Sequence, residues 1–244
     1  MSLLDALLLD PVRIDYWLAV RGDSCSGSGT REDPYNCSFI NTPTTLVSQI
    51  SASGTTATAM APGHGLKNGE RVLVWGATGS VNARSYNGVF TVLNATPSSF
   101  QYVMTGSPTL NAAGTVQCRR NPFLFDQVMR SLPTTTPIAV HLGSGTFYTL
   151  GYHEGLSGGW QILNKMRIVG EGIDVTTVSV AAVTAWSQNA YAMGHDLESA
   201  LGTSPNLRDY VEIRDLTLLL EGSTLFPPPT TIDPLSTIGG VLLM

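Results

Sequence analysis

Residues 166–180 read MRIVGEGIDVTTVSV, two short runs of β-type residues joined by a glycine-rich turn. Similar runs occur before this stretch at 138–142 and after it at 211–213 and 216–220. Each run is rich in β-branched residues, which favour strands, and is followed by glycine or a polar turn. This pattern predicts a coil in which parallel strands stack rung upon rung.

The connections between these runs argue against the main alternative, a doubly wound α/β sheet. Such a sheet needs crossover helices between its parallel strands. None of the connections is long and periodic enough to form one, and only 13% of the residues are charged. Because Gly, Thr, Ser and Val are also abundant, we expect a mainly β fold.

One amphipathic helix is expected just before the later strands. Its apolar residues recur at helical spacing: Leu124, Phe125, Val128, Met129 and Leu132. The pattern predicts a helix of about two turns with one core-facing side. It ends at Pro133, which cannot continue a helix.

Residues 44–118 show a different residue pattern and are predicted to form an inserted domain. Short β-type runs alternate there with turns: 55–60, 71–75, 88–93 and 100–104. The turns include Asn-Gly pairs at 68–69 and 87–88, which are strong hairpin signals. We expect a compact antiparallel β-barrel or sandwich. The fold class is therefore the start of a parallel β-helix with a cap helix and an inserted small β domain.

The remaining residues form an N-terminal segment and the β-helix domain. Residues 1–20 are predicted to be an N-terminal docking or cap segment, because their leucines fit short amphipathic helices broken at Pro11. Residues 21–43 begin with a loop rich in glycine and serine and join 119–244 in the β-helix domain.

Composition limits the partners that the chain can have. The net charge of −5 leaves no basic stripe for nucleic acid, and no run approaches the ~18 apolar residues of a membrane helix. The four histidines, His64, His141, His153 and His195, lack close metal-ligand spacing. We expect no nucleic acid, no membrane span, no metal and no cofactor.

Several stretches resemble the entry region of pectate-lyase-like right-handed β-helix proteins, a family common in phage tail spikes and fibres and among bacterial surface proteins. They are DPVRIDYW at 10–17, GSGT at 27–30, DPYN at 33–36, FDQVM at 125–129, MRIVGEG at 166–172 and VEIRDLT at 211–217. In such proteins the Asp-Pro-Tyr turn leads almost directly into the cap helix. Here the inserted domain separates the two.

The inserted domain carries a second resemblance. Its motifs GHGL at 63–66, GERV at 69–72 and YNGVFTV at 86–92 are similar to small β domains of phage tail and other virion proteins. Together the resemblances imply a virion tail-spike or tail-fibre subunit that attaches to host surface polysaccharide. They imply other tail proteins as partners, a homotrimer and a place in the virion tail. A secreted protein or a bacterial cell-surface adhesin is the alternative.

Enzyme activity stays open as a second alternative. Asp209, Glu212 and Asp215 are the only tight carboxylate group near the later strands, and their spacing does not make them converge. The calcium-binding carboxylates of pectate lyases and the paired aspartates of polygalacturonases have no match. A polysaccharide lyase or glycoside hydrolase would need its catalytic rungs elsewhere in this chain or beyond residue 244, where the apolar run 238–244 carries no cap.

Four residues are candidates for carbohydrate binding: Tyr152, His153, Trp160 and Trp186. Flat aromatic faces stack on sugar rings, and these residues lie in glycine-rich connections where side chains are often exposed. Burial against the flank of the coil is the alternative for each tryptophan.

Two of the three cysteines, Cys37 and Cys118, lie where the chain leaves and re-enters the β-helix domain. A disulfide between them is one possibility, since their Cα atoms could come within about 4.4–6.8 Å. Two reduced, buried thiols are the alternative.

Overall fold

The computed structural model describes residues 13–22, 26–78, 83–153, 160, 162, 166–180, 189–193, 212–219 and 237–241. At 83–84, 152–153, 189–193 and 237–241 the backbone alone is described. Across these ranges the chain is mainly β, with several sheets and one α-helix. The predicted predominance of β structure is therefore confirmed.

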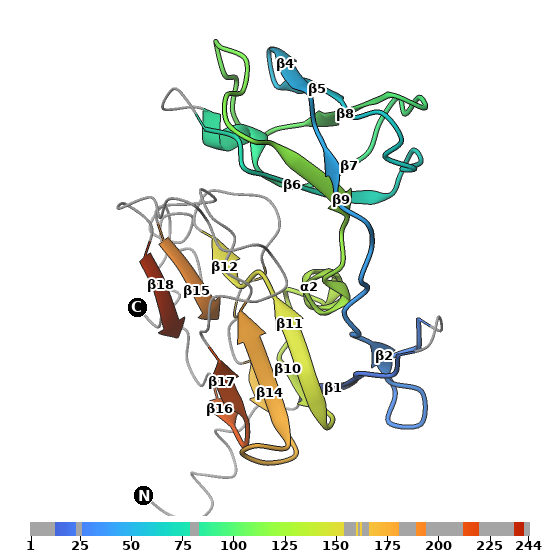
Figure 1. Ribbon diagram of the computed structural model, residues 1–244. Helices are drawn as coiled ribbons and strands as arrows, with labels where there is room; N and C mark the ends of the chain where they lie inside the picture. The colour runs from blue at the N-terminus through green and yellow to red at the C-terminus, as the bar shows by residue number, and fades with distance from the viewer. Residues whose placement is uncertain are drawn as a thin grey trace, which may run out of the picture.

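The largest sheet has five parallel strands in the order β16-β13-β10-β1-β2 (Figure 1). The strands are β1 (Ile14–Ala19), β2 (Tyr35–Asn36), β10 (Ile138–Leu142), β13 (Arg167–Val169) and β16 (Glu212–Arg214). The register places Tyr16, Val140, Ile168 and Ile213 in one row across four of them. All four belong to or pack against one apolar core, so this row faces inward.

Two further sheets repeat the same order along the chain. The second sheet is parallel and contains β11 (Gly145–Thr149), β14 (Thr176–Val180) and β17 (Thr217–Leu219). The third contains β12 (Tyr152–His153), β15 (Asn189–Met193) and β18 (Thr237–Val241). In it β15 and β18 are parallel, whereas β12 and β15 are antiparallel. Three successive trios of strands thus each contribute one strand to each of three sheets.

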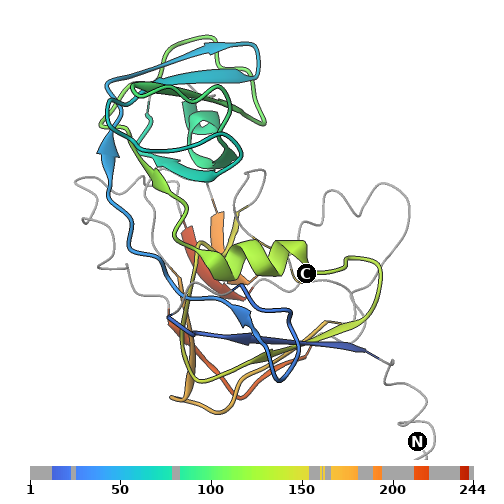
Figure 2. The same cartoon turned by 90° about the vertical axis from the view of Figure 1, so that its right-hand side faces the viewer.

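The single described α-helix, α2 (Leu124–Ser131), lies where the sequence predicts it. Its buried residues Phe125 and Met129 share the core of the parallel strands, one turn apart on the same face. The chain becomes extended at Leu132, because a residue before proline is driven out of the helical region. Figure 2 shows α2 between the parallel strands and a separate antiparallel lobe.

The antiparallel lobe (residues 45–120) consists of two sheets. One has the order β3 (Thr45–Leu46), β9 (Gln117–Arg120), β6 (Arg71–Trp75), β7 (Gly88–Thr91), and the other has the order β4 (Gln49–Ser53), β5 (Thr56–Met60), β8 (Ser99–Val103). All of their described pairings are antiparallel. Between β4 and β5 the chain turns in two residues, with Gly54 at φ 58 as such a tight hairpin requires. A short 3-10 helix, Ala83–Tyr86, precedes β7.

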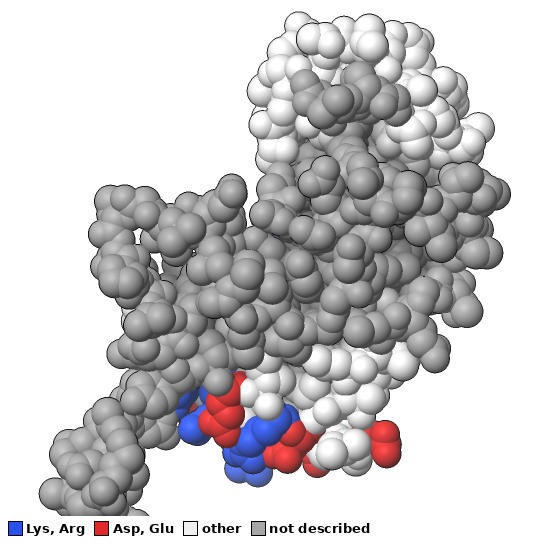
Figure 3. All heavy atoms as spheres, turned by 90° about the vertical axis from the view of Figure 1, so that its left-hand side faces the viewer, with Lys and Arg blue, Asp and Glu red and all other residues white. Residues whose placement is uncertain are grey.

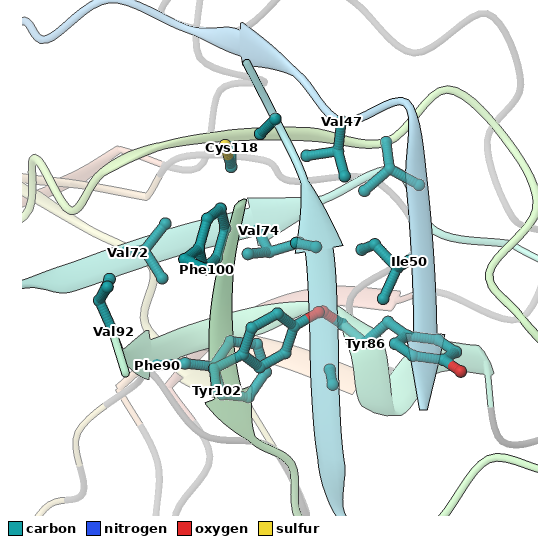
Figure 4. Packing of buried hydrophobic residues seen from close by; sticks show 14 of the residues in the cluster. Val47, Ile50, Val72, Val74, Tyr86, Phe90, Val92, Phe100, Tyr102 and Cys118 are labelled. Atoms are coloured by element: carbon teal, nitrogen blue, oxygen red, sulfur yellow. The ribbon is translucent and has the colours of Figure 1, made fainter. Parts of the chain in front are cut away.

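The antiparallel lobe has its own hydrophobic core. Figure 4 shows side chains from both sheets meeting there, among them Ile50, Val74, Phe90 and Tyr102. The rings of Phe90 and Tyr102 stack with centroids 4.3 Å apart. Of the two predicted forms, the described strands make two sheets around one core, with no closed barrel among them.

A smaller apolar cluster joins the antiparallel lobe to the rest of the molecule, here called the parallel body (the described residues outside 45–120). Leu73, Trp75 and Val89 come from the lobe, and Phe123 and Leu150 come from the parallel body. Because all five are buried, the lobe is packed against the parallel body.

The helical interpretation of the N-terminal segment is wrong for residues 14–19. They form strand β1, which pairs with β10 over five residues. Tyr16 and Leu18 point into the core while Asp15 and Trp17 point outward, an alternation with the period of a strand. Residues 1–12 lie outside the described part of the chain.

Candidate functional site

The outward-facing side chains of the five-stranded sheet form the candidate site, here called the outer face. Neighbouring strands lie about 4.8 Å apart, so residues in register form rows across the sheet. The two outward rows are Asp15, Ala139, Arg167, Glu212 and Trp17, His141, Val169, Arg214. An aromatic residue, a histidine and four charged side chains therefore share one surface.

One end of the outer face contains a contact between three side chains. The Nε2 atom of His141 donates to Oδ1 of Asp15 at 2.8 Å, because an ionised carboxylate can only accept. On its flat side the His141 ring stacks on Trp17, with centroids 4.6 Å apart and an interplanar angle of 12°. The two rings are therefore close to parallel, and the side chains of His141 and Asp15 remain 34% and 48% exposed.

The other end of the outer face contains a chain of ion pairs. Glu212 lies between two arginines, with Oε2 on Arg167 and Oε1 2.7 Å from Nε of Arg214. A further pair joins Nη1 of Arg214 to Oδ2 of Asp215 at 2.5 Å. Figure 3 shows basic and acidic side chains gathered together at the end of the molecule away from the antiparallel lobe. The charges of these two arginines and two carboxylates sum to zero. The planar guanidinium groups lie beside the carboxylates on a partly exposed surface.

These ion pairs involve two of the carboxylates that were considered for catalysis, Glu212 and Asp215. A glycosidase needs two carboxyl groups facing each other across the scissile bond. Both oxygens of Glu212 are engaged by arginine, and Asp215 is turned toward Arg214. Glu212 and Asp215 therefore have the geometry of ion pairs with arginine. Asp209 lies outside the described residues.

The predicted sugar-binding residues fall into three groups. Trp160 is only 2% exposed and lies in the core of the parallel body, edge-on to Phe125, so it takes the buried alternative. Tyr152 and His153 form strand β12, for which the backbone alone is described. Trp186 lies outside the described residues. For these three the carbohydrate-binding role stays a prediction.

Trp160 takes part in a buried polar network at the end of β11. Its indole Nε1 donates to Oγ1 of Thr149 at 3.0 Å, and the Gly151 amide donates to the same oxygen at 2.7 Å. The hydroxyl of Thr149 donates in turn to Oδ1 of Asp126, whose Oδ2 accepts from the Leu150 amide at 2.8 Å. Three strongly buried side chains are thereby satisfied by one another and by the backbone.

The buried setting changes the acidity of Asp126. Burial raises its pKa to about 7, although the hydrogen bonds from Thr149 and Leu150 and the charge of Arg130 act in the opposite direction. Because this carboxyl lies in the core and points at Thr149, we assign it a role in holding α2 against β11.

Cys37 and Cys118 take the second of the two predicted states. Both are buried free thiols, Cys37 in the core of the parallel body and Cys118 in the core of the antiparallel lobe. Burial raises the pKa of Cys118 to about 12, and burial followed by the charge of Asp126 raises the pKa of Cys37 further. Neither thiol is therefore an activated nucleophile.

Sequence reasoning missed the cluster of Trp17, His141, Arg167 and Arg214. These residues lie far apart in the chain and share no motif. A signal was present in the alternation within each β-type run, since every second residue of a half-buried strand faces outward. Which outward residues share a row depends on the register between strands, and the runs themselves do not reveal it.

Comparison with models of known protein families gives no match, and comparison with curated proteins gives no significant match either. No helix in the described ranges is long and apolar enough to cross a membrane. The described residues also contain no group of three or more His, Cys, Asp or Glu side chains placed to hold a metal ion.

Proposed function

We propose that this chain forms the opening rungs of a right-handed parallel β-helix and serves as a virion tail-spike or tail-fibre protein that binds host surface polysaccharide. The observation that carries the proposal is the repeated order of strands. Successive trios, beginning with β10, β13 and β16, each supply one strand to the same three sheets. This is the connectivity expected when a chain coils and stacks on itself.

The outer face supports the choice of a polysaccharide as ligand. It is built on four parallel strands and offers guanidinium, carboxylate, imidazole and indole groups in regular rows. An extended polymer of hydroxyl-rich units can lie across such rows, accept hydrogen bonds from the arginines and pack against ring surfaces. The charges of the two arginines and two carboxylates sum to zero. A ligand on this surface would therefore be held by many hydrogen bonds.

The enzyme alternative predicts a different outcome for the same surface. A hydrolase or lyase would need a free acid or base next to the glycan, whereas Glu212 is held by two arginines. We therefore expect this surface to hold a glycan without cleaving it.

Affinity retention on immobilised capsular and cell-wall polysaccharides tests the proposal. We expect the full chain to be retarded on at least one of them, with no new reducing ends and no unsaturated products. The variant Arg214→Gln, which changes a side chain that is 53% exposed, should weaken retention several-fold. The variant Arg31→Gln removes the same charge from an exposed loop and should leave retention unchanged.

Two results would count against the proposed function. Passage of the unmodified chain through every column would contradict polysaccharide binding. Release of cleavage products would replace the binding role by the enzymatic one.

The trimer and the place in a virion tail are proposed on the resemblance to phage tail spikes. Sedimentation equilibrium should yield three times the chain mass of 25.9 kDa. Antibodies raised against the antiparallel lobe should label tails in electron micrographs of the virion. A monomer, or labelling confined to bacterial cell walls, would favour the adhesin alternative.

A further inference from the structure

A pocket of about 320 Å³ lies between the antiparallel lobe and helix α2. The lobe contributes residues of β6, β7 and β8 with the segments that follow, and α2 contributes Arg130. Two arginines, Arg71 and Arg130, line it, and no carboxylate does. The charged groups that line this pocket are therefore all positive, although the whole chain has a net charge of −5.

Arg71 is held in place within the pocket wall. Its Nη1 donates to Oγ1 of Thr91 at 3.0 Å and its Nη2 donates to the Val89 carbonyl at 3.1 Å. Burial, and to a smaller extent the charge of Arg130, lowers the pKa of Arg71. A guanidinium nevertheless stays protonated in proteins, so this positive charge is fixed and partly desolvated.

Arg130 is the second cation, and it lies exposed in the last turn of α2. Among the described residues it forms no salt bridge, and the carboxylate one turn earlier, Asp126, is bonded to Thr149 and Leu150. Two like charges near a shared pocket repel each other, and an anion between them would remove the repulsion.

Apart from Thr91 and Thr105, the other residues that line the pocket are apolar. Val103 and Leu93 are 55% and 38% exposed, so part of the apolar lining is open to a ligand from solution. A compact inorganic anion would leave these surfaces in contact with water. A ligand that carries its anionic group on a ring with C–H faces would use both kinds of wall.

We propose that this pocket binds a carboxylate-bearing sugar unit, with the carboxylate between Arg71 and Arg130 and the ring against Val103 and Leu93. The volume is at the lower end of the roughly 300–1,000 Å³ range of ligand pockets, which suits one or two sugar units. The proposal rests on the proposed polysaccharide function and narrows it to acidic glycans.

Titration of the full chain, followed by NMR shifts of the arginine side chains, tests the site with four probes: glucuronate, glucose, inorganic phosphate and an acetylated aspartyl peptide. Glucuronate should bind at least about tenfold more tightly than glucose, because a charge-assisted hydrogen bond contributes about that factor. Glucuronate should also bind more tightly than phosphate. Equal affinity for phosphate, or preference for the peptide, would overturn the assignment to a sugar acid.

Variants separate the contribution of the pocket from general effects of charge. Arg130→Gln should weaken glucuronate binding about tenfold, whereas Arg130→Lys should keep part of it, because lysine retains the charge but not the planar fork. Arg31→Gln, with the same loss of charge in an exposed loop, should bind glucuronate as the parent does. Unchanged affinity in Arg130→Gln would overturn the proposal.

The outcomes distinguish a failure of the pocket proposal from a failure of the proposed function. Retention on neutral polysaccharide with no glucuronate binding would overturn the pocket and leave the function standing. Glucuronate binding that Arg130→Gln weakens, without retention on any polysaccharide, would support the pocket and overturn the function.

Discussion

At the scale of the residue, the buried hydroxyl of Thr149 makes three hydrogen bonds. Its hydroxyl oxygen accepts hydrogen bonds from Trp160 and Gly151, and its single proton goes to Asp126. Both lone pairs and the proton are therefore in use. The network joins α2, β11 and the segment at Trp160 through one side chain.

Replacing Thr149 with valine should destabilise the protein by about 2–4 kcal/mol, because the variant leaves two buried donors and a buried carboxyl without their partner. Urea unfolding followed by tryptophan fluorescence measures the change. Thr146→Val on the same strand is the matched control, since Thr146 is half-buried and has no side-chain hydrogen bond among the described residues. It should change the free energy of unfolding by no more than about 0.5 kcal/mol. Equal effects of both substitutions would contradict the role of the network.

The buried carboxyl of Asp126 should make stability depend on pH. Its pKa is about 7 in the folded protein, above the ordinary value of 3.8, so between these values the folded state holds a proton that the unfolded state has lost. Stability from this group is present in full below about pH 4, decreases as the pH rises and is lost above about pH 7.

Free energies of unfolding at several pH values between 4 and 8 measure this contribution, which should amount to a few kcal/mol. Arg130 is the ionisable group that acts on Asp126, and Asp126 in turn acts on the thiol of Cys37. The comparison is therefore with Asp126→Asn, which leaves both unchanged and should lack this part of the slope. Parallel curves for the two proteins would show that Asp126 stays ionised throughout.

At the scale of the element, α2 lies between the two parts of the molecule (Figure 2). One side packs on the parallel strands through Phe125, whose ring lies 5.4 Å from Phe147 and 5.6 Å from Trp160 between centroids. The opposite side carries Arg130 to the pocket at the antiparallel lobe. The position of this helix therefore affects the core and the proposed binding site together.

Phe125→Ala should cost about 3–5 kcal/mol, because the fully buried ring leaves a cavity among aromatic neighbours. Circular dichroism during thermal unfolding measures the loss. Gln127→Ala, on a half-buried position of the same helix, should cost less than about 1 kcal/mol. A similar loss in both variants would mean that helix formation, and not packing of the ring, sets the stability.

At the scale of the whole molecule, the antiparallel lobe and the parallel body have separate cores and share the smaller cluster around Phe123 and Leu150. No strand of the lobe pairs with a strand of the parallel body within the described ranges. The lobe begins at β3 and ends at β9, and these two strands pair with each other. Its ends are thus close together, as an insertion into another domain requires.

Residues 44–120 produced alone should therefore fold and unfold cooperatively, with a stability reduced by the loss of the shared cluster. Far-UV circular dichroism and amide hydrogen exchange would detect the folded lobe. A chain that stays disordered in isolation would show that the contacts of Leu73, Trp75 and Val89 with the parallel body are needed for folding.

Local sequence signals were sufficient for the features that depend on near neighbours. The 3.6-residue spacing before Pro133 located α2, and the β-branched runs located β10, β13 and β14. The Asn-Gly pair at 87–88, in contrast, is not a hairpin turn, because Gly88 is the first residue of β7 and pairs with Val74. Backbone preference and side-chain alternation are properties of a few consecutive residues, so the sequence by itself determined them.

The tertiary structure alone decided the features that depend on partners distant in the chain. Residues 14–18 have a spacing compatible with a helix, yet pairing with β10 makes them a strand. The rows that join Asp15 to Glu212, the burial of Trp160 and the meeting of Arg71 with Arg130 likewise need contacts between distant segments. Register and burial are set by the free energy of packing whole sheets together, and no single segment contains that information.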